Sequence, residues 1–309
     1  MRTHLPSIGP MERALFLRSI PLFRRLRAAD LAASAQSLEE VSLRRDTVLY
    51  GPRIGVPSVY LLVEGQVVSH QQGEVVARYT APDVAGLVEL LAGAGSVPEA
   101  VARTRVLALT LDAAALFDLI EDRFRLFLEL RRALGEQLRQ LQERTGIHHR
   151  SMVLHGFEPP PQRQLTTPER LLMLQRLPLF QSVGLSVLAA LSRDEVELVP
   201  GGTVLWEAGD EAASGVIVVE GELRCEPPVP AEEFRVGRGD MAGAAAMLGG
   251  LPHSCTAVAA RDVALLRLDA VMLVDLAEDN PDLAQGILAT LAREILRLQP
   301  LAASRKEED

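Results

Sequence analysis

The side chains that could catalyse a reaction or bind a metal are few and poorly grouped. His148, His149 and His155 lie near one another in the sequence, but no cysteine or carboxylate accompanies them at the spacing of a zinc site. The sequence also has no nucleophile beside a base, no Walker loop and no pair of carboxylates placed for acid–base catalysis. We therefore predict that the protein is not an enzyme and uses no metal and no cofactor.

Two cysteines, Cys225 and Cys255, are too few for a disulfide framework, so a reducing compartment is the simpler assumption. We expect Cys255 to be a packed thiol rather than a reactive one. Arg103 and Arg105 are two residues apart on a predicted strand, which places both on one face, and we expect that face to be solvated. None of these four residues is predicted to form a site.

Composition indicates an ordinary globular protein. The 309 residues are 48 % hydrophobic and 24 % charged, which is enough for two domains with separate cores. No apolar run approaches the roughly 18 residues of a membrane span, and the N-terminal residues include prolines and charges where a secretory signal needs an apolar stretch. The net charge is −9 and there is no dense basic stripe. We predict a cytoplasmic protein that binds neither membranes nor nucleic acid.

The sequence contains two copies of one complete domain. The same landmarks recur with offsets of 157, 156 and 156 residues, and such a long period excludes a short solenoid repeat. The matched pairs are Pro21-Leu22-Phe23 with Pro178-Leu179-Phe180, Thr47-Val48-Leu49-Tyr50 with Thr203-Val204-Leu205-Trp206, and Glu64-Gly65 with Glu220-Gly221. We predict domains over 12–143 and 168–300, joined by a linker over 144–167.

Each copy changes from helical to strand-like periodicity and back. After an opening helix, short β-branched runs are separated by Gly, Pro and Asp, which indicates an antiparallel sandwich or roll. A short alanine- and glycine-rich stretch interrupts the strands, and a long amphipathic helix closes each copy. The predicted fold class is mainly β with flanking helices, built as two tandem β-rolls of the jelly-roll type.

These landmarks resemble the cyclic-nucleotide-binding domain, the β-roll of bacterial catabolite-activator-type regulators and of kinase regulatory subunits. The resemblance covers almost the whole sequence. It rests on the Pro-Leu-Phe turns, the aromatic residue after each Val-Leu (Tyr50, Trp206), the Glu-Gly turns, Gly239-Asp240, and the Leu-x-x-Leu-Asp run from Leu265 to Asp269. In this family a short cassette holds the cyclic phosphate, with a glutamate that accepts the ribose hydroxyl and an arginine that pairs with the phosphate.

Both cassettes depart from that pattern. In the second copy Gly243 and Pro252 are retained, but Ala244 stands at the glutamate position and His253 at the arginine position. In the first copy Leu87 stands at the glutamate position and Ser96 at the arginine position. The candidate ligand positions are Gly86, Leu87 and Ser96 in the first copy, and Gly243, Ala244, His253, Ser254 and Thr256 in the second.

A lost charge-assisted phosphate contact removes about 1.5–3 kcal/mol of binding free energy. We therefore expect cAMP and cGMP not to be ligands, and we expect Leu87, Met247 or Leu248 to fill the pockets. The alternative is that His253 carries partial positive charge and supports weak anion binding in the second copy.

The closing helices have apolar seams suited to pairing with another helix. The seam residues are Phe127, Leu130, Leu134, Leu138 and Leu141 in the first helix, and Ile287, Leu291 and Ile295 in the second. We predict a protein partner or self-association through these helices, although each helix could instead cover its own roll. The residues after Leu298 are too few for the helix-turn-helix of the transcription factors in this family.

From the sequence we predict a non-enzymatic regulatory or scaffold protein that acts through protein–protein interaction and whose two ligand sites have degenerated. The alternative is a ligand-gated regulatory subunit that binds a cyclic nucleotide or another anion in its second domain.

Overall fold

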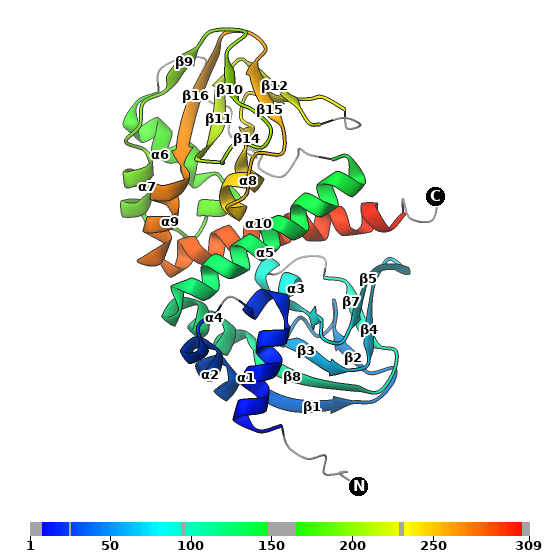
Figure 1. The fold of residues 1–309 in the computed structure, drawn as a ribbon. Helices are drawn as coiled ribbons and strands as arrows, with labels where there is room; N and C mark the ends of the chain where they lie inside the picture. Colours follow the sequence, from blue (N-terminus) through cyan, green and yellow to red (C-terminus); the bar gives the residue numbers. More distant parts are fainter. Residues whose placement is uncertain (1–7, 25, 94–96, 148–164, 229–231, 305–309) are drawn as a thin grey trace. The chain divides into compact units, whose positions relative to one another are not determined.

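The computed structural model describes residues 8–24, 26–93, 97–147, 165–228 and 232–304 (Figure 1). The chain divides into two compact units, Met1–Leu130 with Ile295–Asp309, and Arg131–Glu294. Each unit contains one β-roll. The domain boundaries and linker expected from the sequence stay a prediction, and most of that linker, together with His148, His149 and His155, lies outside the described residues.

The first roll consists of two four-stranded antiparallel sheets. One has the order β1 (Glu39–Leu43), β8 (Val106–Asp112), β3 (Ser58–Glu64) and β6 (Val84–Ala85). The other has the order β2 (Val48–Tyr50), β7 (Glu99–Ala102), β4 (Gln66–Gln71) and β5 (Glu74–Thr80). Its helical elements are α1 (Pro10–Ser19), η1 (Pro21–Phe23), α2 (Ala28–Gln36), α3 (Leu87–Ala92), α4 (Ala113–Asp122) and the beginning of α5 (Phe124–Thr145).

The second roll has the same construction. One sheet has the order β14 (Met241–Ala242), β11 (Ser214–Glu220), β16 (Val263–Asp269) and β9 (Glu197–Val199). The other has the order β10 (Val204–Trp206), β15 (Thr256–Ala259), β12 (Glu222–Glu226) and β13 (Phe234–Gly237). The remaining helical elements are α6 (Thr167–Gln175), η2 (Pro178–Phe180), α7 (Leu185–Leu191), α8 (Ala244–Gly249), α9 (Ala270–Glu278) and α10 (Pro281–Ser304).

The two rolls share one topology. Adding eight to each strand number of the first roll reproduces both sheet orders of the second, and the neighbouring strands pair antiparallel in both rolls. Gly65 and Gly221 occupy equivalent turns with the same φ of 96°. The predicted fold class, mainly β with flanking helices in two tandem rolls, is confirmed.

Burial explains why the central strands are continuously apolar. Val216, Ile217, Val218 and Val219 of β11 all have 0 % exposure. Val216 and Val218 belong to the core between the two sheets, and alternation directs Ile217 and Val219 to the opposite face. A strand buried on both faces needs an uninterrupted apolar run rather than an alternating pattern.

Several of the repeated landmarks are helix ends. The aspartate that ends each long strand caps the next helix: Asp112 accepts from the backbone N–H of Ala115 at 2.8 Å, and Asp269 accepts from that of Met272 at 2.7 Å.

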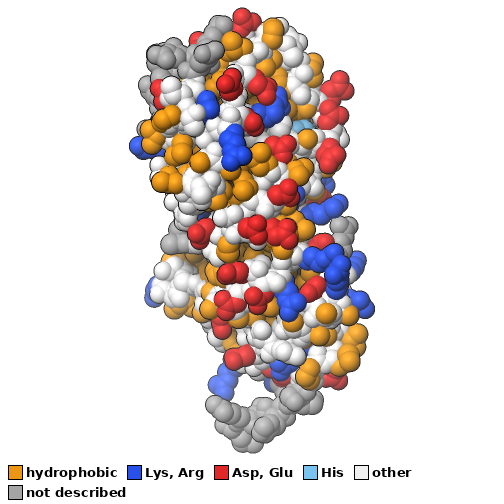
Figure 2. All heavy atoms as spheres, turned by 90° about the vertical axis from the view of Figure 1, so that its left-hand side faces the viewer, with side chains coloured by type: hydrophobic (Ala, Val, Ile, Leu, Met, Phe, Trp, Pro, Cys, Tyr) orange, Lys and Arg blue, Asp and Glu red, His pale blue; other side chains and the backbone are white. Residues whose placement is uncertain are grey.

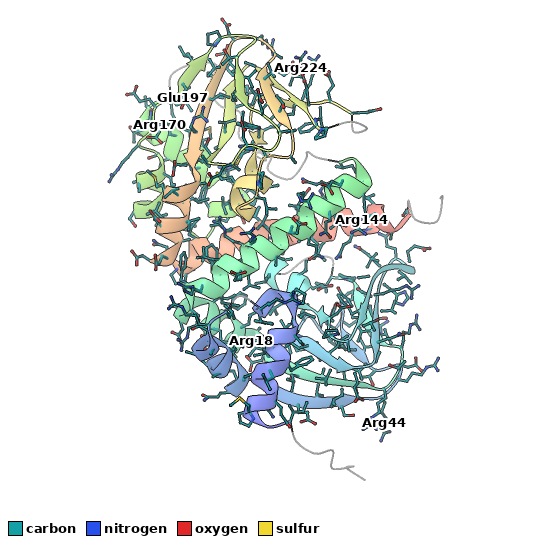
Figure 3. All side chains as sticks on the ribbon, viewed as in Figure 1. Arg18, Arg44, Arg144, Arg170, Glu197 and Arg224 are labelled. Atoms are coloured by element: carbon teal, nitrogen blue, oxygen red, sulfur yellow. The ribbon has the colours of Figure 1, made fainter. Side chains whose placement is uncertain are left out.

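Arg170 of α6, labelled in Figure 3, is buried and donates to the carbonyl oxygens of Leu165 and Ser192. These bonds satisfy backbone acceptors that would otherwise be buried without a partner.

Among the described residues, no helix combines the length and apolar character needed to cross a membrane.

The contact between α10 and the Pro-Leu-Phe turn of the second roll provides a test of this packing. A Cβ at Gly286 would overlap the carbonyl oxygen of Leu179, whereas a Cβ at Gly237 would meet no atom within 4 Å. Alanine would gain about 1 kcal/mol of helix propensity at Gly286, but overlap with a fixed backbone atom costs more. We expect Gly286→Ala to lower the free energy of unfolding by about 1–2 kcal/mol in urea denaturation. Gly237→Ala should stay within about 0.5 kcal/mol of the natural chain, and equal effects of the two substitutions would contradict the packing.

Candidate ligand pocket

A cavity of about 40 Å³ lies at the cassette of the second roll. Gly243, with φ of 76°, makes the left-handed step from β14 into α8 at this point. The lining residues are Gln142, Cys225, Phe234, Met241, Ala242, Gly243, Ala244, Ala245, Ala246, His253, Ser254 and Cys255. All of them lie in the unit Arg131–Glu294. The lining combines small side chains with a few polar groups, as in many pockets for small molecules.

His253 is fixed in place on the wall of this cavity. Its ring stacks on Trp206 with a centroid distance of 4.2 Å and an interplanar angle of 9°. Its backbone N–H donates to the carbonyl oxygen of Asp210 at 2.8 Å, and its own carbonyl accepts from Gly209 at 2.9 Å. A Cβ at Gly243 would come within 2.9 Å of the imidazole Cε1, so only glycine leaves room for the stacked ring.

His253 is uncharged at neutral pH. The side chain is 5 % exposed, and burial lowers its pKa to about 4 despite the opposing effect of Asp210. The alternative in which this residue carries partial positive charge is therefore disfavoured, because burial against Trp206 removes the imidazole from water. Its ring nitrogens can contribute hydrogen bonds to a ligand, but not a charge.

Some of the other candidate residues of the second copy line the cavity and others do not. Ala244 and Ser254 line it, whereas Thr256 does not, and its hydroxyl accepts from the backbone N–H of Ala208 at 3.1 Å. Met247 and Leu248 are buried but do not line the cavity. The expected filling of this pocket by those two side chains is therefore not observed.

The first cassette has a different interior. Gly86, with φ of 85°, begins α3 as Gly243 begins α8. Leu87, however, lines a separate cavity of about 20 Å³ whose walls are aliphatic or aromatic except for Ser34. Its expected role in filling a ligand pocket stays a prediction. Ser96 lies outside the described residues.

A carboxyl group is buried in the first cassette. Glu89 on α3 is 1 % exposed. Its Oε1 accepts hydrogen bonds from the hydroxyls of Tyr50, at 2.9 Å, and Tyr79, at 3.3 Å. Its Oε2 is buried and has no hydrogen-bond partner. Both tyrosines belong to or pack against the core between the two sheets of this roll, so the carboxyl group points into that core.

The repeat relates Glu89 to the pocket of the second roll. With the offset of 157 that relates Gly86 to Gly243, Glu89 corresponds to Ala246, which lines the second cavity. Tyr50 corresponds to Trp206, the stacking partner of His253, with the offset of 156. In the first roll, a carboxyl group thus occupies the position that corresponds to the cavity of the second roll. Sequence reasoning missed Glu89, although one charged residue within the apolar run Leu87–Ala92 was a visible signal.

Burial shifts the pKa of each of the three groups in this cluster. It raises the pKa of Glu89, and the hydrogen bonds from its own backbone and from Tyr50 and Tyr79 oppose that rise only in part. Burial also raises the pKa of both tyrosines well above the ordinary value, and the neighbouring carboxyl group adds to the effect. The phenols therefore remain hydrogen-bond donors at neutral pH.

The seam residues of α5 and α10 are already covered within one chain. All eight are buried, with exposures of 0–3 % for Phe127, Leu130, Leu134, Leu138, Leu141, Ile287, Leu291 and Ile295. Because these side chains are buried without a second protein chain, their role in association with a protein partner or a second copy stays a prediction.

No three His, Cys, Asp or Glu side chains in the described part of the chain are grouped so that they could hold a metal ion.

The buried carboxyl group makes stability depend on pH. An unfolded glutamate titrates near ~4.3, and the folded-state pKa of Glu89 is higher. Between these values the folded chain holds a proton that the unfolded chain has released, so the free energy of unfolding falls as pH rises. We expect Glu89→Gln to remove this contribution, and its stability relative to the natural chain should increase with pH in urea denaturation. Glu74→Gln, at an exposed strand end, should show no such trend, and parallel curves for all three proteins would refute the assignment.

His253 predicts the opposite slope. An unfolded histidine titrates near ~6.5, whereas the pKa of folded His253 is about 4. As pH falls from about 6.5 to about 4, protonation favours the unfolded chain and stability is lost. In thermal melts over this range, His253→Gln should lose less stability than the natural chain. A His253→Gln curve parallel to that of the natural protein would show that this imidazole is accessible to protons in the folded state.

Residues 196–280 match the family model described as "Cyclic nucleotide-binding domain". Over 119 residues the chain is 32 % identical to a cyclic nucleotide-gated potassium channel of Rhizobium etli, in an alignment that covers 38 % of this chain and 33 % of the channel. The chain therefore spans about a third of the length of this curated relative.

The chain is also similar to two solved structures. The regulatory subunit of a cAMP-independent protein kinase A from Trypanosoma brucei is 16 % identical, with 86 % of each chain covered and a TM-score of 0.35. The regulatory domain of Toxoplasma gondii PKA, crystallised with cAMP, is 14 % identical, with 97 % of each chain covered and a TM-score of 0.33.

The expectation that cAMP and cGMP are not ligands was wrong. It rested on two missing side chains, whereas the second roll matches a family model described by cyclic nucleotide binding, and the curated relative is named as a cyclic nucleotide-gated channel. Residues 196–280 belong to the cyclic nucleotide-binding domain family, and the first roll repeats the architecture of the second.

Proposed function

We propose that this protein is a ligand-gated regulatory protein whose second roll binds a small anion of the cyclic-nucleotide class. The observation that carries the proposal is the cavity at the second cassette, within the segment that matches the family model. This is the alternative that the sequence left open.

The pocket would recognise its ligand mainly through shape and hydrogen bonds. None of the described residues that line it is an arginine or a lysine, and His253 is neutral. The polar lining groups are the Ser254 hydroxyl, the His253 imidazole, the Gln142 amide and backbone atoms. Neutral hydrogen bonds contribute about 0.5–1.5 kcal/mol each, less than a charged contact, so complementarity of shape has to supply much of the affinity.

We assign a different role to the first roll. The carboxyl group of Glu89 and the two tyrosine hydroxyls form a hydrogen-bonded cluster at the position that corresponds to the second cavity. We propose that the first roll is a structural partner and that the second roll responds to the ligand.

We also propose that the output is a protein contact in the cytoplasm and that the protein has no catalytic step. Apolar side chains remain exposed on helices of the second roll, among them Leu172 of α6, Leu185 of α7 and Val271 of α9. On the face shown in Figure 2, apolar and acidic side chains are interspersed. Exposed apolar surface of this kind favours a protein partner over nucleic acid.

Titration calorimetry with cAMP and cGMP tests the ligand proposal on the natural chain. We expect saturable binding of at least one nucleotide. Ala246→Leu should weaken it about tenfold or more, which corresponds to about 1.4 kcal/mol, because it extends an isopropyl group into the cavity. Ala189→Leu makes the same change at an exposed position of α7 and should leave the affinity unchanged.

Two results would contradict the proposal. One is the absence of binding of either nucleotide to the natural chain. The other is binding that Ala246→Leu does not affect while the variant remains folded by circular dichroism.

A further inference from the structure

Both cysteines of the chain are in the interior of the second roll. Cys225 lies on β12 and is 1 % exposed, and Cys255 immediately precedes β15 and is 7 % exposed. They belong to one apolar core and line the same cavity of about 40 Å³. The sequence separates them by 29 residues, so only the fold brings them together.

The strand register directs the two thiols to the same side. Cys225 pairs with Ala257 across the β12–β15 ladder, and Cys255 lies two residues before Ala257. Side chains two residues apart on a strand point to one face, so Cys225 and Cys255 are diagonal neighbours on the inner face. The two thiols are close enough to shift each other's pKa.

The two thiols are chemically unequal. The neighbouring Cys225 lowers the pKa of the Cys255 thiol although burial opposes this, whereas Cys255 and burial raise the pKa of Cys225. Cys255 is therefore the thiol that ionises first, and thiolates are the reactive form. Sequence reasoning treated Cys255 as an inert packed thiol because it could not place Cys225 beside it.

We propose that Cys225 and Cys255 form a redox-sensitive pair, in which a peroxide that enters the cavity converts the two thiols into a disulfide across the ligand pocket of the second roll. The disulfide itself is independent of the proposed function. Its consequence for ligand binding rests on that function.

The reaction balances with hydrogen peroxide as the oxidant. The Cys255 thiolate attacks one peroxide oxygen, the O–O bond breaks, and the departing hydroxide takes up the thiol proton as water. Cys225 then attacks the sulfenic sulfur, the S–O bond breaks, and a second water leaves with the Cys225 proton. Two thiols and one hydrogen peroxide give one disulfide and two waters, and the two sulfurs supply the two electrons.

The disulfide would narrow the pocket. A disulfide holds its two Cβ atoms about 3.5–4.5 Å apart, so it would draw the end of β12 toward the segment that carries His253 and Ser254. Both of those residues line the cavity. We therefore expect oxidation to weaken ligand binding.

Intact mass and thiol alkylation measure the disulfide directly. The reduced full-length chain is treated with hydrogen peroxide, denatured and alkylated. The natural chain should lose the mass of two hydrogen atoms, take up no alkyl group, and return to two reactive thiols with dithiothreitol, which does not reverse methionine oxidation. Trp206, the single tryptophan, lies in the same core as both thiols and should change its fluorescence reversibly.

Cys225→Ala and Cys255→Ala are the matched controls, with folding checked by circular dichroism. Neither variant should lose two hydrogen atoms or show the reversible Trp206 signal, and Cys255 in Cys225→Ala should form a sulfenic acid that dimedone traps. Two alkylatable thiols in the oxidised natural chain, or a disulfide between two chains, would overturn the proposal.

Calorimetry with cAMP then separates this inference from the proposed function. If the reduced chain binds cAMP, the oxidised chain should bind it at least about tenfold more weakly, and equal affinity would overturn the regulatory role. If the reduced chain does not bind cAMP, the proposed function fails, whereas the mass and fluorescence results alone decide whether the thiol pair is a redox site.

Discussion

The cost of burying an ionised group explains the difference between the two cassettes. An unpaired charge inside a protein is so unfavourable that the group changes its protonation state or acquires hydrogen-bond partners. In the first roll, burial raises the pKa of Glu89, and two tyrosine hydroxyls donate hydrogen bonds to one of its oxygens. In the second roll, His253 loses its charge on stacking against Trp206. The second cassette therefore needs no counter-ion for His253 at neutral pH.

The two rolls share one backbone topology, but their cassettes contain different side chains. The sheet orders, the Gly-initiated cassette helices and the capping aspartates are the same in both. The two cassettes differ in their side chains, with Glu89 in the first and Ala246 at the equivalent position of the second. The alanine leaves a cavity, and the cavity brings His253, Ser254 and the two thiols into one small volume. A neutral pocket of this kind favours selection by shape over selection by charge.

Much of the fold could be predicted from the sequence because the repeated landmarks have local causes. Asp112 and Asp269 cap helices through residues three positions away, and such short-range signals are visible in a sequence. The location of the cassettes followed from the same landmarks. The interior of the cassettes did not, because it depends on contacts between distant residues. Tyr50 reaches Glu89 across 39 residues, and Trp206 stacks on a histidine from another part of the roll. Helical periodicity showed that Leu134 and Ile287 would be buried, but it gave no information about what covers them.

Hydrogen–deuterium exchange of the full-length chain with and without cAMP tests the central claim most directly, because it reports on both cassettes in one experiment. The account predicts slower exchange confined to the second cassette, over Met241–Thr256, with no change over Val84–Ala92. Protection of the first cassette, or no protection in either roll at saturating cAMP, would contradict it.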